Sequence, residues 1–382
     1  MCSRYILLIF FSLGQYVVSQ QGIHNFGNLQ LHQKGQLGFH SDLINDGSFE
    51  NNLGLMGFYD HEEGLTISGA FTPTFHDLEL ALDNDLLLDV TIRVDNSLSF
   101  IYGNIQTPRK YRNVYANFSE DAIYSGLVNQ SKIDGYAAVT DQKSFRFPVG
   151  QGAVSKPLHI QFVDGVFLAK CAYFMENPGN PKSFAESFDL NNRDQELGIV
   201  CPQEFWNLKT SGRIQITLDW DEQTNLSFYT EDLTGITVAG WNILNKEWQN
   251  LGNAKIEGDL EQGSVMSHIF NANDYEIFTY GFINDPDKDK PGNYAITPNG
   301  DGINDNFSLK IIEQSPNNTL QIYNRAGLLV YEKTNYKNEF KGVGNRNILF
   351  RNNLLPEGVY FYLLELKDIN RSYQGYFYLS IE

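Results

Sequence analysis

The residues that could do chemistry are common in this 382-residue chain, but few stand at the spacings that chemistry requires. The seven histidines form no recognised metal or catalytic spacing, and His61-Glu62-Glu63 lacks the second histidine of a zinc-protease helix. No Gly-x-Ser-x-Gly sequence is present, and no cysteine has the sequence context of a nucleophile. Carboxylates are plentiful, so the sequence is compatible with the two catalytic carboxylates of a glycosidase, but no particular pair is indicated. The sequence therefore predicts a protein that is not an enzyme.

One glycine-rich loop places several oxygen ligands close together. Its oxygen-bearing residues are Asn299, Asp301, Asn304 and Asp305. Three alternating aspartates stand just upstream, at Asp285, Asp287 and Asp289. Calcium takes about six to eight such oxygens, but the spacing is not that of an EF-hand and no glutamate closes the loop. Asn-Gly and Asp-Gly pairs are also typical of tight turns, so a turn is the preferred interpretation and calcium is the alternative. No other cofactor is predicted.

Two cysteines remain beyond Cys2, at Cys171 and Cys201. In an oxidising compartment they could form a disulfide, which would stabilise the fold by roughly 3–4 kcal/mol. Cys171 lies in the apolar run 166–174, where a buried free thiol is the alternative. The sequence leaves both states open, with the disulfide as the expected one.

The N-terminus has the organisation of a secretory signal. Arg4 precedes an apolar stretch from Tyr5 to Leu13, and the small residues Val17 and Ser19 fit a cleavage site before Gln20. We therefore predict a signal peptide over residues 1–19. No other segment approaches the roughly 18 apolar residues of a membrane-spanning helix, so a soluble, exported protein is expected.

The chain is strongly acidic, with a formal charge of −18 and a pI near 4.8. Such a surface repels phosphates, which argues against nucleic acid as a partner. The acidic residues are spread along the chain, and we interpret the charge as a determinant of solubility rather than as a binding patch.

Apolar residues alternate with polar ones over a long part of the body. They occupy even-numbered positions, namely Leu78, Leu80, Leu82, Leu86, Leu88, Val90, Ile92, Val94, Leu98 and Phe100. A period of two predicts strands with one buried face, whereas a helix would show spacings of three and four. We expect these strands to form an antiparallel meander.

A change in sequence texture near Asp134-Gly135 divides the body. We predict an N-terminal β-rich domain over 20–135, a second β-sandwich domain over 136–283 and a polar, proline-containing linker over 284–293. Trp220, Trp241 and Trp248 are expected to pack in the core rather than to form a carbohydrate platform. The expected fold is all-β, with antiparallel β-sandwich domains in series.

Turn and strand signals follow in order through residues 294–382. They are Thr297-Pro298-Asn299-Gly300-Asp301-Gly302-Ile303-Asn304-Asp305, Asn324-Arg325-Ala326-Gly327, Pro356-Glu357-Gly358-Val359-Tyr360-Phe361-Tyr362 and Gln374-Gly375-Tyr376-Phe377. Glycine tolerates the positive φ of a tight turn, and alternating aromatic residues favour strands. The segment is therefore predicted to be a small antiparallel β-sandwich of about seven strands.

This ordered set resembles the C-terminal sorting domain of the Bacteroidetes type IX secretion system, in its type B or gliding-motility-associated form. The residues that match the motifs are Thr297, Pro298, Asn299, Gly300, Asp301, Gly302, Asn304, Asp305, Asn324, Arg325, Gly327, Pro356, Gly358, Tyr360, Tyr362 and Gly375. Two features depart from the pattern. Phe340-Lys341-Gly342 replaces the usual Trp-Asp-Gly turn, and the chain ends on Glu382 rather than on a basic residue.

The resemblance implies an Ig-like sorting domain over 294–382 that contacts the type IX secretion machinery at the outer membrane. It implies export to the cell surface or the extracellular space. We expect a non-enzymatic adhesion or gliding-associated interaction module that binds surface or motility proteins. The alternatives are a carbohydrate-binding or polysaccharide-degrading protein that meets extracellular glycans, and a subunit that stays with the export machinery.

Overall fold

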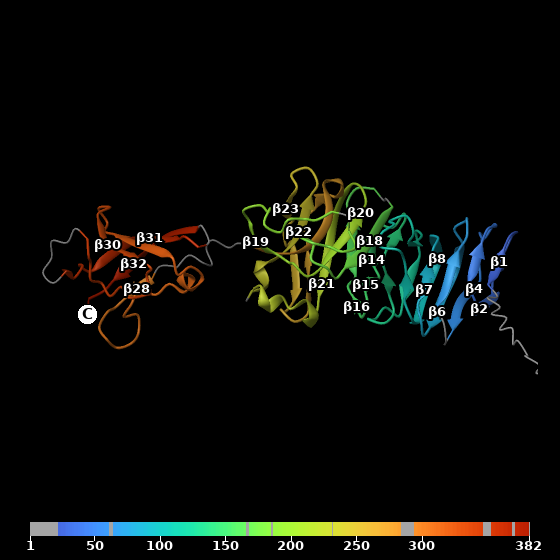
Figure 1. Ribbon diagram of the computed structural model, residues 1–382, viewed down its shortest axis with the longest axis horizontal. Helices are drawn as coiled ribbons and strands as arrows, with labels where there is room; N and C mark the ends of the chain where they lie inside the picture. Colours follow the sequence, from blue (N-terminus) through green and yellow to red (C-terminus); the bar gives the residue numbers. More distant parts are fainter. Residues whose placement is uncertain are drawn as a thin grey trace, which may run out of the picture. The chain divides into compact units, whose positions relative to one another are not determined.

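The computed structural model describes residues 22–60, 64–165, 168–184, 186–230, 232–283, 294–346, 353–368 and 371–381. The chain separates into two compact units, Met1–Asn284 and Asp285–Glu382 (Figure 1). The expected signal peptide (1–19) and linker (284–293) lie outside the described residues. In the part that is described, no helix has the length and apolar character needed to span a membrane.

The first unit begins as a β-solenoid, in which successive strands join two sheets alternately (Figure 1). One sheet contains β1 (Ile23–Asn25), β3 (Leu43–Asn45), β5 (Leu65–Ser68), β7 (Leu86–Leu88), β9 (Ile105–Gln106), β12 (Ile133–Asp134), β15 (Val149–Gln151) and β16 (Val154–Ser155). The other begins with β2 (Gln36–Phe39), β4 (Leu55–Asp60), β6 (Thr74–Leu82), β8 (Ile92–Tyr102), β10 (Ala116–Phe118) and β13 (Ala137–Val139). Neighbouring strands from β1 to β13 within each of these sheets run parallel.

The expected meander over 78–100 is wrong, although its buried face is confirmed. Leu78, Leu98 and the other apolar residues at the even-numbered positions named above are buried, except Val90, which is partly buried. However, β6 pairs with β8 in parallel, while the intervening β7 pairs with β5 in the other sheet. Alternation reports which face of a strand is buried but not the direction of its neighbour, so the pattern is compatible with both folds.

Antiparallel strands continue the larger sheet beyond β13. They are β18 (Ala169–Phe174), β20 (Phe205–Lys209), β27 (Tyr275–Ile283), β22 (Ile236–Asn242) and β23 (Glu247–Asn250), with β19 (Leu197–Val200) beside β27. In the solenoid part of the same sheet, β11 (Ile123–Ser125) pairs with β8 in parallel. A third sheet contains β14 (Ser144–Phe147), β17 (Leu158–Phe162), β21 (Arg213–Trp220), β25 (Gly263–Met266) and β24 (Lys255–Gly258), with β26 (Phe270–Asn271) beside β21. The short 3-10 helices are η1 (Glu222–Thr224), η2 (Leu226–Phe228), η3 (Leu233–Gly235) and η4 (Ala272–Asp274).

The body is therefore a solenoid rather than a series of β-sandwich domains, which corrects the fold expected from the sequence. The larger sheet pairs strands from both sides of residue 135, because β13 joins β10 on one side and β18 on the other. The expected division between 20–135 and 136–283 thus falls inside one compact unit. The change of texture near Gly135 coincides with the change from parallel to antiparallel pairing.

Buried asparagines connect the first turns of the solenoid. Asn25 Nδ2 donates to Asn45 Oδ1 at 2.8 Å, and Asn45 Nδ2 donates to the Phe71 carbonyl at 3.0 Å. Gly69 passes so close to Asn45 that an added Cβ would lie 2.3 Å from its carbonyl oxygen, and its φ of +119° is also unfavourable for other residues. These side-chain amides satisfy buried polar groups that strand pairing alone leaves over.

The tryptophans and cysteines of the body are core residues. Trp220, Trp241 and Trp248 are at most 9% exposed, so they pack as expected and offer no carbohydrate platform. Cys171 and Cys201 are free and buried, which is the alternative to the expected disulfide. Cys171 lies opposite Leu208 within the β18–β20 ladder. Cys201 precedes β20, and its backbone N–H donates to the Tyr280 carbonyl on β27. Burial raises the pKa of both thiols, that of Cys201 to about 12.

The second unit contains one five-stranded sheet in its described part, where about seven strands were expected. Its order is β28 (Tyr294–Ile296), β32 (Arg371–Leu379), β31 (Gly358–Leu366), β29 (Asn318–Tyr323) and β30 (Leu329–Thr334). Only β28 and β32 pair in parallel among these strands. Loops and the 3-10 helix η5 (Lys310–Gln314) cover one face of the sheet and contribute Phe307, Tyr336, Phe340 and Leu355 to its core. Irregular backbone thus supplies packing that we had expected from further strands.

Candidate functional site

The loop after β28 folds back on its own side chains. The Asp305 carboxylate accepts hydrogen bonds from the backbone N–H groups of Gly300 (2.6 Å) and Gly302 (2.9 Å). Asp301 Oδ1 accepts from Ile303 N at 2.7 Å, and both glycines have φ near +85°. The backbone donors of Gly300 and Gly302 hold the pKa of Asp305 below its ordinary value. The types and spacing of these residues therefore build a tight turn that is stabilised by a carboxylate.

The same hydrogen bonds occupy oxygen atoms that a calcium ion would need as ligands. Both Asp305 oxygens already receive amide hydrogens, and Asn299 Oδ1 accepts from Asp301 N at 3.0 Å. Within the described ranges, no group of three or more His, Cys, Asp or Glu residues could hold a metal ion. The upstream aspartates, Asp285, Asp287 and Asp289, lie outside those ranges. A calcium site here remains a prediction for experiment.

The remaining motif residues build turns and core. Asn324 Oδ1 accepts from the N–H groups of Ala326 and Leu328, both at 3.0 Å, and closes the β29–β30 turn at Gly327 (φ 76°). Arg325 is exposed at that turn.

A second group of motif residues surrounds β31. Tyr360 Oη donates to the Pro356 carbonyl at 2.7 Å, and Gly358 has a φ of 148°. Tyr360 and Tyr362 are buried, and an added Cβ on Gly375 would lie 2.3 Å from Tyr362 Oη. The motif therefore specifies how the unit folds more than it specifies an exposed surface.

The opposite face of the five-stranded sheet is exposed and rich in aromatic residues. Phe361 lies opposite Tyr376, with their ring centroids 6.4 Å apart, and Val359 lies opposite Tyr378. Phe361, Tyr376 and Tyr378 are 47%, 42% and 43% exposed. We call Val359, Phe361, Tyr376 and Tyr378 the open face. This face was not predicted from the sequence, although the alternation of side chains along β31 places Phe361 on the side opposite to Tyr360 and Tyr362.

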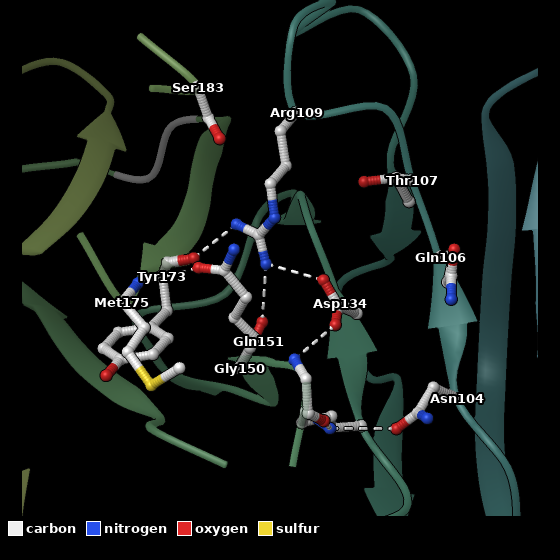
Figure 2. A network of polar contacts seen from close by, with 12 residues as sticks. Asn104, Gln106, Thr107, Arg109, Asp134, Gly150, Gln151, Tyr173, Met175 and Ser183 are labelled. Atoms are coloured by element: carbon white, nitrogen blue, oxygen red, sulfur yellow. Dashed lines mark hydrogen bonds and ion pairs between the residues drawn. The ribbon is translucent and has the colours of Figure 1, made fainter. Parts of the chain in front are cut away.

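In the first unit, Arg109 joins three strands at the point where parallel pairing ends (Figure 2). Its guanidinium donates to the Tyr173 carbonyl on β18, to Asp134 Oδ1 on β12 at 2.7 Å and to the Gly150 carbonyl on β15 at 2.9 Å. The Arg109 and Asp134 side chains are only 13% and 20% exposed. Such a nearly buried charge pair with further hydrogen bonds holds its surroundings in one geometry.

Beside Arg109 lies a cavity of about 510 Å³, which we call the junction pocket. Its lining residues are Arg109, Lys110, Arg112, Lys182, Ser183 and Phe184. The Arg112 guanidinium lies 4.6 Å from the centre of the Phe184 ring and forms an ion pair with Glu276 at 2.6 Å. The junction pocket thus combines basic side chains with an aromatic wall.

Sequence reasoning also missed the junction pocket. Arg109-Lys110-Tyr111-Arg112 is a local basic cluster in an acidic chain, and that contrast was the available signal. The sequence did not indicate that residues 182–184 lie beside it. The basic residues are therefore not distributed as evenly as the overall charge suggested.

A separate buried network lies around β18 and β20. Tyr173 Oη donates to Glu204 Oε2 at 2.5 Å, and Lys156 Nζ contacts Asp221 Oδ1 at 2.6 Å and Thr224 Oγ1 at 2.5 Å. Glu204 and Lys156 are each 3% exposed, and burial raises the pKa of Glu204. Because Glu204 and Lys156 are enclosed and each is bonded to neighbouring side chains, we interpret the network as structural.

A family model matches the second unit. Residues 290–379 match the CHU_C type IX secretion signal domain. No curated protein and no solved structure matches the chain. The protein is a substrate of the type IX secretion system and carries a type B C-terminal sorting domain. That signal implies contact with the type IX machinery and export across the outer membrane to the cell surface or the extracellular space.

Proposed function

We propose that the exported protein is a non-enzymatic interaction module, with an adhesion or gliding-associated role at the cell surface. The observation that carries this proposal is the solenoid. Stacked turns create an extended surface, and solenoids commonly use such surfaces for binding. The first turns expose large apolar side chains, with Phe26 at 74%, Leu53 at 52% and Phe71 at 57% exposure. A partner that covered these side chains would remove their apolar surface from water, which favours binding.

The test is cross-linking on intact cells, followed by purification through a tag inserted between residues 285 and 292 and by mass spectrometry. Recovery of surface or motility proteins is expected. A protein that is free in the medium and brings down no partner would contradict the interaction role. A parallel preparation in which Phe26 and Phe71 are changed to serine should lose those partners while its export is unchanged.

Carbohydrate binding is a second candidate, and the junction pocket favours it. The tryptophans do not support it, because all four are buried. Degradation of a polysaccharide would need a pair of carboxylates around the glycosidic bond, and no pair has been singled out. A glycan-binding screen and a hydrolysis screen separate these possibilities from the first proposal.

The open face of the sorting domain supports a third candidate, a subunit that stays with the export machinery. Apolar aromatic side chains with polar tips are common in protein interfaces. The same cross-linking experiment tests this candidate, because a resident subunit would be recovered with outer-membrane export proteins and with residues 290–382 still attached.

A further inference from the structure

We propose that the junction pocket binds an anionic sugar residue, one that carries a carboxylate or a sulfate group. The inference deepens the carbohydrate-binding candidate and does not depend on the protein-partner role. It rests on the basic residues that line the pocket, on the hydrogen bonds that fix its sides, and on its aromatic wall and volume.

The charge of the pocket contrasts with that of the protein. Four of its six lining residues are basic, whereas the whole chain carries a formal charge of −18. Arg109 and Arg112 have carboxylate partners in Asp134 and Glu276. Lys110 and Lys182 form no ion pair with the described part of the chain. Two lysines without a carboxylate partner therefore line one cavity, which favours an anionic occupant. The Lys110 ammonium lies 5.9 Å from the centre of the Tyr111 ring.

Both sides of the pocket are held in place. Arg109 fixes one side through its three bonds to β12, β15 and β18. On the other side, the Glu176 carboxylate accepts hydrogen bonds from Lys182 N (2.6 Å), Ser183 N (3.0 Å) and Ser183 Oγ (2.5 Å). A pocket whose loops are already ordered loses less entropy when it binds a ligand.

The wall and the size of the pocket suit a sugar. Phe184 lines the pocket beside the basic residues, and the Arg112 guanidinium lies over its ring. Aromatic side chains contact the apolar C–H faces of sugar rings while polar neighbours bind their substituents. The volume of about 510 Å³ lies within the roughly 300–1,000 Å³ that is usual for small-ligand pockets. Uronates and sulfated sugars combine such a ring with the anionic group that the lysines would bind.

The experiment is isothermal titration of the purified full-length protein with a galacturonate trisaccharide and with a sulfated disaccharide. A neutral cello-oligosaccharide and inorganic sulfate serve as comparison ligands. We expect the two acidic sugars to bind, with an affinity that falls as salt rises. The neutral sugar and the bare anion should bind at least about tenfold more weakly than the better acidic sugar. Whichever acidic sugar binds more tightly identifies the anionic group.

Variants locate the site. The double variant Lys110→Ala/Lys182→Ala should weaken binding of the acidic sugar by about tenfold or more. Lys143→Ala/Lys209→Ala, which removes two exposed lysines elsewhere, changes the net charge equally and should bind normally. Phe184→Ala should weaken binding of the sugar without strengthening that of sulfate.

Three results would overturn the inference. They are no binding of either acidic sugar, an equal loss of binding in both double variants, and inorganic sulfate binding as tightly as the sugars. None of them bears on the partners recovered by cross-linking, so failure here is distinguishable from failure of the proposed interaction role.

Discussion

At the scale of single residues, Asp305 stabilises the loop that follows β28. Its carboxylate is partly exposed and accepts two backbone hydrogen bonds, from Gly300 and Gly302. Because these bonds favour the charged form, the folded-state pKa lies below the unfolded value. The stabilisation is present above the unfolded pKa and is lost as the pH falls through the folded pKa.

We predict that Asp305→Ala lowers the melting temperature of the sorting-domain transition at neutral pH, and that Asp305→Asn lowers it less, since one acceptor oxygen remains. EDTA should leave the transition unchanged if the loop is only a turn. A calorimetric scan of the full chain measures all of these effects. If EDTA lowers the melting temperature and Asp301→Ala abolishes that sensitivity, the loop binds calcium and the turn interpretation is insufficient.

The contribution of Glu204 to stability should have the opposite pH dependence. Burial raises its folded-state pKa, so the charged form is less favourable in the folded state than in the unfolded state. Its contribution to stability is fully present below the unfolded pKa and declines as the pH rises toward the raised folded value. Glu204→Gln should therefore gain stability relative to the parent protein as the pH increases through this range. Denaturant unfolding at several pH values measures the difference, and the exposed Glu257→Gln is the control.

At the scale of elements, the asparagine contacts between β1, β3 and the turn after β5 hold the first solenoid turns in register. Asn45 is fully buried and contacts both neighbouring turns. Replacing it by alanine removes one of the two acceptors of Asn25 Nδ2, which keeps only its bond to the Ser48 carbonyl. The same change removes the side-chain donor to the Phe71 carbonyl.

We predict that Asn45→Ala lowers the free energy of unfolding of the body by about 1–3 kcal/mol. Urea unfolding followed by tryptophan fluorescence reports the body, because the four tryptophans lie within the first unit. The exposed Asn113→Ala should change stability little. An equal effect of the two substitutions would show that the buried amide contacts do not set stability.

At the scale of the whole molecule, the body and the export signal form separate compact units. Strand pairing within residues 22–283 does not involve the second unit in the described structure. The body should therefore fold without the sorting domain.

We predict that deleting residues 285–382 leaves a folded body that accumulates inside the outer membrane. Cell fractionation gives its location, and circular dichroism of the purified body gives its fold. Appearance of the truncated protein in the medium at parental levels would show that a second export signal exists.

Much of the sorting domain could be predicted from the sequence, because its turns depend on local residue types. Asp305, Asn324 and Gly327 act within a few positions of themselves, and Tyr360 bonds to Pro356 four residues away. The inward-facing residues of β6 and β8 were predictable for the same reason, since alternation along one strand is local.

Only the tertiary structure decided that the body winds as a solenoid. A related pattern occurs in Ile23-His24-Asn25-Phe26-Gly27 and Leu43-Ile44-Asn45-Asp46-Gly47, but successive turns differ in length. Ile23 pairs with Leu43, an offset of 20, whereas Leu43 pairs with Ile67, an offset of 24. Irregular turns hide a repeat that only pairing over long sequence separations reveals. The same long-range pairing brings residues 109–112 beside 182–184, so the turns and buried faces follow from local sequence, while the winding and the junction pocket follow from contacts between distant segments.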